Sequence, residues 1–265
     1  MRLRGSVVLL TGATGGMGQC ILGSLISAGA EVVVVGRDEA VLARVVAHHG
    51  SSVVPVRADI RNKIDREHLV QIMKERAGFN LLINAAGIND FDMFEHQSDA
   101  QVSDMVDINL TSTLLLTRSM LPLLKRAPEA SVVMIGSTFG AIGYPGFATY
   151  CATKFALRGF SEALRRELAD TQVGVLYLAP RATRTAMNSK AIEQMNQALK
   201  VKTDAPEEVA RRLMLALEQG LSEVHLGFPE RLFIRINGLL PNLVGRSIHK
   251  QLSVIRRFAT QVEES

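Results

Sequence analysis

A glycine-rich turn near the start of the chain constrains its fold more than any other feature. The run Thr11-Gly12-Ala13-Thr14-Gly15-Gly16-Met17-Gly18 directly follows the apolar residues 7–10 and opens a helical pattern. In an open α/β sheet, such a turn places backbone N–H groups at a helix N-terminus, where they can receive a diphosphate. The turn taken alone could equally be structural. Its candidate cofactor-binding residues are Gly12, Thr14, Gly15, Gly16, Met17 and Gly18.

Short β-branched and apolar runs alternate with helical patterns along the chain. The expected strands are residues 6–11, 31–35, 53–57, 80–84, 131–135, 173–178 and 223–226. The expected helices are residues 16–28, 39–49, 65–76, 103–126, 149–169 and 206–219. Continuous apolar strands are typical of parallel sheets that helices cover on both faces. The alternation therefore predicts a single α/β domain with a Rossmann-type, doubly wound parallel sheet of about seven strands flanked by helices.

The composition is that of a globular protein and excludes several other classes. The chain has 265 residues, of which 47% are hydrophobic and 21% charged, without low-complexity tracts or internal repeats. Its two cysteines, Cys20 and Cys151, are far apart in the sequence, so we expect neither a disulfide framework nor a metal site. The apolar residues 7–10 are too few for a signal peptide or a membrane span, which favours the cytoplasm.

A tyrosine and a lysine stand four residues apart in the expected helix 149–169, as Tyr150 and Lys154. Four residues turn through roughly 400° of an α-helix, so the two side chains leave the same face. A neighbouring ammonium stabilises a phenolate and would lower the pKa of the phenol toward neutral pH, where acid/base chemistry needs it. A solvated helix face is the alternative, because this spacing also arises by chance.

With the turn, the alternation and this pair together, the sequence resembles the short-chain dehydrogenase/reductase family over almost its whole length, weakening after about residue 226. Its first turn matches the family pattern T-G-x-x-x-G-x-G, and residues 84–87 resemble the family's N-N-A-G with Ala85 in place of the second Asn. The resemblance implies that the nicotinamide side of the cofactor passes beside Asn84, Ala85, Ala86 and Gly87. It also implies that Asp59 and Ile60 contact the adenine, although Asp59 could instead cap a helix.

Four residues stand in the order and approximate spacing of the family's catalytic tetrad, namely Asn109, Ser137, Tyr150 and Lys154. By this resemblance, Tyr150 exchanges a proton with the substrate oxygen, and Lys154 binds the ribose hydroxyls of the cofactor. Ser137 follows the expected strand 131–135, so its hydroxyl could bond the substrate carbonyl oxygen. Asn109 is implied to interrupt a helix and to hold a water of a proton relay.

The end of the second expected strand indicates which nicotinamide cofactor binds. Proteins of this architecture that bind NAD usually carry an acidic residue there, whereas a nearby Arg accommodates the 2′-phosphate of NADP. This chain has Gly36 followed by Arg37, so we expect NADP(H) in preference to NAD(H). Asp38 leaves an alternative open, since it could cap the next helix or bind the ribose.

After the sixth expected strand, Pro180, Thr183 and Thr185 resemble the family segment that contacts the cofactor's carboxamide. Arg181 replaces the family's usual Gly, and it either faces an anionic substrate or turns to solvent. Residues 186–203 are expected to form a mobile lid over the substrate. Cys151 projects from a different helix face than its neighbour Tyr150, and we interpret it as a packing residue.

A C-terminal extension, residues 228–265, is expected to pack on the Rossmann domain of residues 1–227. From residue 231 to residue 262 it contains no Asp or Glu but interleaves basic with large apolar side chains, so the excess behind the net charge of +4 lies here. It could close the substrate pocket or form the interface of a homodimer or homotetramer. It could also meet an anionic membrane or an acidic acyl-carrier protein. No recognition motif accompanies the charge, so we expect no nucleic-acid partner.

These expectations combine into an NADP(H)-dependent oxidoreductase that interconverts a carbonyl and a secondary alcohol of a small molecule. The enzyme is expected in the cytoplasm, with membrane association through the tail left open. One alternative is a 3-oxoacyl thioester reductase of lipid or polyketide synthesis, acting on acyl-carrier-protein or coenzyme A thioesters. Another is a noncatalytic redox sensor or scaffold that binds nucleotide.

Overall fold

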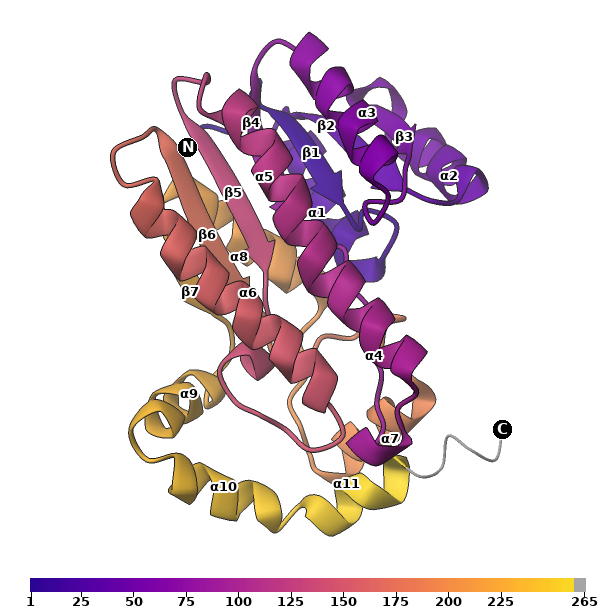
Figure 1. Ribbon diagram of the computed structural model, residues 1–265, viewed down its shortest axis with the longest axis vertical. Coiled ribbons are helices and arrows are strands. Elements are labelled where there is room, and N and C mark those ends of the chain that lie inside the picture. The colour runs from indigo at the N-terminus through magenta and orange to yellow at the C-terminus, as the bar shows by residue number, and fades with distance from the viewer. Residues whose placement is uncertain (260–265) are drawn as a thin grey trace.

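The computed structural model describes residues 1–259, so residues 260–265 of the expected C-terminal extension lie outside the described residues. Within residues 1–259, seven parallel strands form one sheet in the order β3-β2-β1-β4-β5-β6-β7. They are β1 (Val7–Thr11), β2 (Glu31–Gly36), β3 (Val53–Arg57), β4 (Phe79–Asn84), β5 (Ala130–Ile135), β6 (Val173–Ala179) and β7 (Glu223–His225). The predicted Rossmann-type sheet in a single domain is confirmed (Figure 1).

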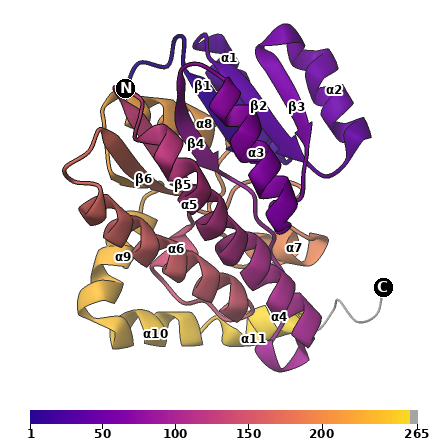
Figure 2. The same ribbon diagram turned by 45° about the horizontal axis from the view of Figure 1, so that its top comes forward.

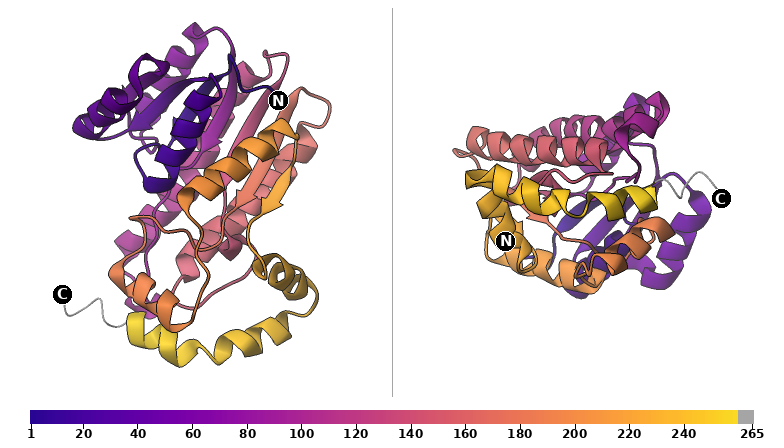
Figure 3. Two further views of the ribbon diagram at one scale, coloured as in Figure 1. Left: turned by 180° about the vertical axis from the view of Figure 1, so that it is seen from behind. Right: turned by 90° about the horizontal axis from the view of Figure 1, so that it is seen from below.

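Helices cover both faces of this sheet. The helices within residues 1–259 are α1 (Gly16–Ser27), α2 (Glu39–His49), α3 (Lys63–Glu75), α4 (Asp99–Val106), α5 (Ser112–Leu124), α6 (Ala148–Glu167), α7 (Lys190–Ala198), α8 (Pro206–Glu218), α9 (Glu230–Leu239), α10 (Pro241–His249) and α11 (Leu252–Ala259). Val8 and Leu10 of β1 pack with α1, α2 and α8, while Leu9 points to the other face, where α3, α5 and α6 pack. Figure 2 shows the second group of helices, and the left view of Figure 3 shows α1 and α8. Because both faces are buried, the central strands are largely apolar instead of alternating.

The strand order reverses between β1 and β4. β1 pairs with β2 on one side and with β4 on the other, so the chain first builds outward to β3 and then returns to build β4 to β7. In open α/β sheets, ligands bind outside the carboxyl ends of the strands at such a switch point. The glycine turn after β1 and the residues after β4 both lie there.

The helix expected over residues 103–126 is interrupted, as the family resemblance implied for Asn109. α4 begins earlier than expected, where Ser98 and Gln101 form a capping box. Residues Asp107–Thr111 then widen into a π-helical turn before α5 begins. Such turns are rare and frequently lie at functional sites. Asn109 is fully buried inside this one.

Two helical regions that the sequence did not indicate lie beyond the carboxyl ends of the strands. α7 occupies the expected lid, and its Ile192 and Met195 are buried in a cluster with residues of α11. Residues 228–259, here called the C-terminal arm, form an arc of α9, α10 and α11 along the base of the molecule in Figure 1, and the right view of Figure 3 shows this arc from below. Ile234 of α9 and Val244 of α10 pack on the loop that follows β5.

Candidate active site

A cleft of about 540 Å³ lies at the switch point of the sheet. Its lining includes most of the predicted cofactor residues: Gly12, Thr14, Gly15, Gly16, Met17, Gly18, Arg37, Asp59, Ile60, Ala85, Ala86, Gly87, Tyr150, Lys154 and Thr185. Residues far apart in the sequence thus meet in one concave site, because the strands carry their loops to the same edge. Its volume falls in the range of small-molecule sites.

The glycine turn has the shape that a phosphate cradle requires. Gly12 has a φ of +72°, and a Cβ there would lie 2.6 Å from the carbonyl carbon of Ala85. A Cβ on Gly18 would overlap the carbonyl oxygen of Gly12. Gly16 lines the cleft, where a Cβ would come no closer than 3.5 Å to another residue. The bare main chain at the N-terminus of α1 therefore fits a diphosphate group.

Three of the predicted cofactor residues do not line this cleft. Asn84 is buried beneath it, and its side-chain amide donates to Thr117 Oγ1 at 3.1 Å. Pro180 and Thr183 line a neighbouring pocket instead. The Thr183 hydroxyl donates to the carbonyl oxygen of Arg181 at 2.9 Å. Direct contact of these three with a cofactor stays a prediction.

Charged residues in the loops after β2 and β3 bear on the choice between NAD(H) and NADP(H). Arg37 is exposed and lines the cleft. Asp38, which left the choice open, caps α2, where its Oδ1 accepts a backbone N–H at 3.1 Å. Asp59 does not cap α3, because Asn62 does so. Hydrogen bonding from Arg61 holds the pKa of the Asp59 carboxyl below its ordinary value, and the charge of Arg37 adds to this shift.

An apolar pocket of about 620 Å³ adjoins the cleft. The residues that line both hollows are Met17, Asn89, Gly136, Tyr150, Thr185 and Met187. Aromatic rings of Phe139, Tyr144 and Phe147 pack together on one wall, with the Phe139 ring centroid 5.1 Å from that of Tyr144 and 5.1 Å from that of Phe147. α7 and the C-terminal arm supply Ile192, Met195, Phe233, Val244 and Ile248. The arm therefore forms part of the pocket.

Three members of the predicted tetrad meet where the two hollows join. Ser137 lines the apolar pocket, Lys154 lines the cleft, and Tyr150 lines both. The Ser137 Oγ accepts the Phe139 N–H at 3.1 Å. Lys154 Nζ donates to the Ile135 carbonyl at 3.0 Å and lies 5.4 Å from the centroid of the Tyr150 ring. The shared helix face expected for Tyr150 and Lys154 is thus realised on α6.

Burial shifts the pKa values of both Tyr150 and Lys154. Burial of the Tyr150 hydroxyl raises its pKa above the ordinary value, although hydrogen bonding with Ser137 acts in the opposite direction. Part of the Tyr150 side chain nevertheless remains accessible from the pocket. Burial also lowers the pKa of Lys154 to about 8. In the protein alone, burial sets the direction of the Tyr150 shift, and a lowering of this pKa by the Lys154 ammonium stays a prediction.

Asn109, the fourth predicted tetrad residue, lines neither hollow. Its Oδ1 accepts the Ile88 N–H at 2.7 Å, and its Nδ2 donates to the Ile88 carbonyl at 2.8 Å. The same Nδ2 lies 3.3 Å from Thr153 Oγ1, next to Lys154 on α6. Asn109 thus ties the loop after β4 to the helix that carries Tyr150 and Lys154. The expected interruption of the helix is confirmed, and the water relay stays a prediction.

Tyr177 of β6 is a site residue that sequence reasoning missed. It is buried, and its hydroxyl lies 3.4 Å from both the backbone N and the backbone O of Ser137. A Cβ on Gly136 or on Gly140 would overlap the Tyr177 side chain. The signal in the sequence is an aromatic residue within an aliphatic strand, together with glycines on both sides of Ser137. Tyr177 therefore supports the loop that carries Ser137.

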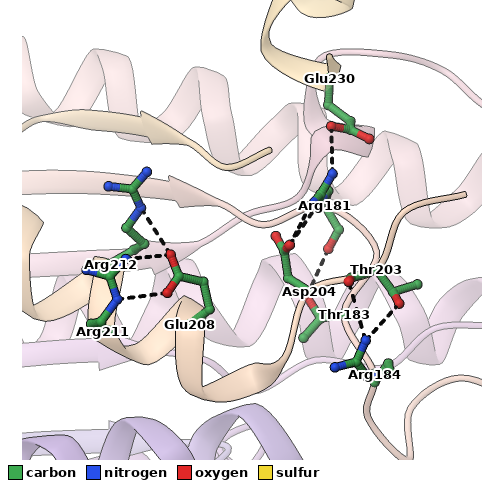
Figure 4. A network of polar contacts seen from close by, with 9 residues as sticks. All are labelled: Arg181, Thr183, Arg184, Thr203, Asp204, Glu208, Arg211, Arg212 and Glu230. Atoms are coloured by element: carbon green, nitrogen blue, oxygen red, sulfur yellow. Dashed lines mark hydrogen bonds and ion pairs between the residues drawn. The ribbon is translucent and has the colours of Figure 1, made fainter. Parts of the chain in front are cut away.

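Arg181 is not turned to solvent but lies in a network of ion pairs, and its contact with an anionic substrate stays a prediction. Its Nη2 and Nε bind Asp204 Oδ1 at 2.6 Å and 3.0 Å, and its Nη1 lies 3.3 Å from Glu230 Oε2. Figure 4 shows the guanidinium between the two carboxylates. The network joins the loop after β6, the segment ahead of α8 and the first turn of α9. Arg181 also lines the apolar pocket, so this network fixes part of its wall. Cys151 is buried, as expected of a packing residue.

Comparisons with known proteins agree with this geometry. The family model described as short chain dehydrogenase matches residues 6–196. An uncharacterized oxidoreductase of Bacillus subtilis, DltE, is 30% identical over 227 residues, which cover 84% of this chain and 89% of that protein. The 3-oxoacyl-[acyl-carrier-protein] reductase FabG of Aquifex aeolicus is 31% identical over 223 residues, which cover 79% of this chain and 89% of that protein.

Solved structures share the fold but hold different cofactors. A short chain dehydrogenase/reductase of Burkholderia phymatum in complex with NAD has a TM-score of 0.83 at 21% identity, covering 92% of this chain and 96% of that one. A short chain dehydrogenase of Burkholderia cenocepacia in complex with NADP has a TM-score of 0.80 at 26% identity, covering 94% and 99%. The likeness to the first is one of fold alone. Since the family model spans most of the chain, this protein belongs to the short chain dehydrogenase family of oxidoreductases.

Proposed function

We propose that this oxidoreductase interconverts a carbonyl and a secondary alcohol with NADP(H) as its cofactor. The observation that carries the proposal is the meeting of Ser137, Tyr150 and Lys154 where a cleft with a phosphate cradle joins an apolar pocket. A nicotinamide group, when bound, supplies or accepts the hydride. The chain supplies the rest, namely binding, orientation and proton exchange.

The cleft offers partners for the diphosphate, the adenine and the 2′-phosphate of a dinucleotide. The N-terminus of α1 and its glycine turn suit the diphosphate, and Asp59 and Ile60 lie where the adenine is expected. Arg37 is placed to pair with a 2′-phosphate, while Asp38 is already used as a helix cap. We therefore propose NADP(H) in preference to NAD(H), because the positive charge of Arg37 lies in the cleft.

The raised pKa of Tyr150 suits proton donation to a substrate oxygen. A phenol that stays protonated at neutral pH can donate to the developing alkoxide during reduction. The Ser137 hydroxyl can bond the same oxygen, because it lies on the pocket side of Tyr150. Lys154 faces the cleft, where its ammonium can hold the ribose hydroxyls and stabilise the phenolate that reduction leaves behind.

The apolar pocket favours a substrate with a hydrocarbon part. A 3-oxoacyl thioester is the second candidate, and the 3-oxoacyl-[acyl-carrier-protein] reductase among the relatives supports it. Lys200 and Lys202 also line the pocket, where they could meet the phosphate of a carrier's pantetheine arm. A noncatalytic nucleotide-binding sensor is the remaining candidate, and it predicts no turnover of any carbonyl.

Replacing the proposed proton donor tests the function. Ketones, diketones and 3-oxoacyl thioesters are offered to the protein with NADPH, and the absorbance of the cofactor reports turnover. Tyr150→Phe should lower turnover by about 10²–10⁴-fold, because it removes the acid but keeps the ring. Tyr144→Phe is the matched control, since its phenol lines the same pocket and binds Gln251 Oε1 at 2.8 Å. A Tyr150→Phe enzyme within a few-fold of wild type, or an equal loss in both variants, contradicts the assignment.

A further inference from the structure

The C-terminal arm exposes large apolar side chains on α9 and α10 and at the residues beside these helices. They are Phe228, Leu232, Leu239, Leu240 and Leu243, with Leu239 exposed to 81%. The inward side of the same helices is buried through Ile234 and Val244, so the helices are held in place while the leucines face outward. A contiguous exposed apolar patch of this kind usually marks a contact with a partner or a membrane.

Basic side chains interleave with these apolar ones. They are Arg231, Arg235, Arg246 and Lys250, and all of them are exposed. Arg235 stands three residues after Leu232 and four before Leu239, so the three share one helix face. Arg246 stands three residues after Leu243 and does the same on α10. These four basic and five apolar residues are here called the outer arm face.

The chemistry of the outer arm face distinguishes among its potential occupants. In a two-fold dimer, the same face of a second copy would bring arginines against arginines, which repel. An acidic protein would satisfy the charges, but it would also need an apolar groove matched to the exposed leucines. An anionic bilayer offers both counterparts, since the leucines can enter the acyl boundary while the cations meet headgroup phosphates.

We propose that the outer arm face docks this protein on an anionic lipid bilayer. The attachment is peripheral, because none of the helices within residues 1–259 is long and apolar enough to cross a membrane. The arm lies along one end of the molecule, at the opposite end from the N-terminus (Figure 1). The inward side of the arm lines the apolar pocket through Phe233, Val244 and Ile248. Docking therefore places the pocket next to the bilayer, where apolar substrates concentrate.

Vesicle binding by the full chain tests the proposal without any assay of turnover. The protein is sedimented with vesicles of phosphatidylcholine alone and of phosphatidylcholine mixed with phosphatidylserine, at low and high salt. We expect sedimentation with the mixed vesicles only, and release by salt, because surface charge attraction is screened over a Debye length. The double variant Arg235→Glu with Arg246→Glu should lower the partition coefficient by roughly tenfold or more.

Matched variants separate the charge from the apolar contribution. Lys125→Glu with Arg126→Glu reverses two exposed charges at the other end of the sheet, after α5, and should leave binding unchanged. The variant Leu239→Ser with Leu243→Ser should weaken binding. Its control, Ile64→Ser, alters a side chain of α3 that is exposed to 73%, and should not. An unchanged thermal midpoint shows that each variant remains folded.

Three results would overturn the proposal. One is sedimentation that does not depend on phosphatidylserine. Another is equal binding by the Arg235→Glu, Arg246→Glu double variant and by its control at the other end of the sheet. The third is a wild type that does not bind vesicles and whose arm variants instead change the oligomeric state, seen by light scattering, or lose binding to acyl carrier protein.

Discussion

Lys154 combines a candidate catalytic role with an expected cost in stability. Burial lowers its pKa from 10.5 to about 8, so between these values the unfolded chain binds more protons than the folded protein. Through this group, stability therefore rises with pH from about 8 to 10.5, and the penalty is complete below 8. Catalytic groups commonly carry such a penalty, because the burial that tunes them also strains the fold.

Replacing Lys154 should expose this penalty directly. Lys154→Met removes the ammonium, so we expect the variant to be more stable than wild type at pH 7, with an advantage that shrinks as the pH rises toward 10.5. Urea unfolding of both proteins across this pH range measures the difference. A difference that stays constant with pH would show that burial of the charge is not its cause.

Gly136 and Tyr177 should prove energetically coupled, because the ring fills the space where a Cβ on Gly136 would lie. Gly136→Ala should lower the free energy of unfolding by about 1–3 kcal/mol, as overpacking typically does. Tyr177→Leu removes the ring, so the double variant should be more stable than the sum of the single changes predicts, by about 1 kcal/mol. Denaturant unfolding of the four proteins completes the cycle. Additive effects would mean that the two residues do not compete for the same space.

At the scale of elements, polar contacts between helices and loops hold the site residues that the strands bring together. The π-helical turn between α4 and α5 buries Asn109, which binds the loop after β4. The ion pairs of Arg181 join the loop after β6 to the start of α9. These contacts connect the loops around the cofactor cleft and the apolar pocket to α6 and to the C-terminal arm. Breaking one of these contacts should therefore change substrate binding in the apolar pocket.

Arg181→Leu should loosen the C-terminal arm. It leaves the largely buried carboxylates of Asp204 and Glu230 without their cation, which is destabilising even though part of each remains accessible. We expect faster hydrogen exchange in α9 and a higher KM for an apolar substrate, with cofactor binding little changed. Arg184→Leu is the matched control, because that side chain only bonds Thr203 at an exposed position. Equal exchange in α9 of both variants would contradict this role.

At the scale of the whole molecule, cofactor binding should stabilise the fold and report cofactor preference without a known substrate. A ligand at 100 times its Kd stabilises the native state by about 2.7 kcal/mol. We expect NADPH to raise the thermal midpoint more than NADH at equal concentration. Arg37→Ala should abolish most of this difference while leaving the ligand-free midpoint unchanged, because Arg37 is exposed. A wild type that NADH stabilises more would refute the preference for NADP(H).

Local sequence patterns were sufficient for the sheet and for the glycine turn, whereas the family resemblance supplied most other residues of the cofactor cleft. Continuous apolar strands alternating with helices predict a doubly wound parallel sheet, and parallel strands bring their carboxyl ends to one edge. The glycine turn required no tertiary information either, because its φ and its close approach to Ala85 are properties that glycine alone tolerates. The spacing of Tyr150 and Lys154 likewise determined that they share a helix face.

The tertiary structure decided what depends on contacts between distant segments. Burial raises the pKa of Tyr150 and lowers that of Lys154, whereas the sequence indicated only that these two side chains lie close enough to attract each other. The partners of Arg181 lie 23 and 49 residues away along the chain, so no local pattern could indicate them. Ile234 and Val244 of the C-terminal arm are buried against the loop that follows β5, a contact that no local pattern indicated. The sequence of the arm carries both charge and hydrophobicity, and only packing determines which side chains line the pocket and which face outward.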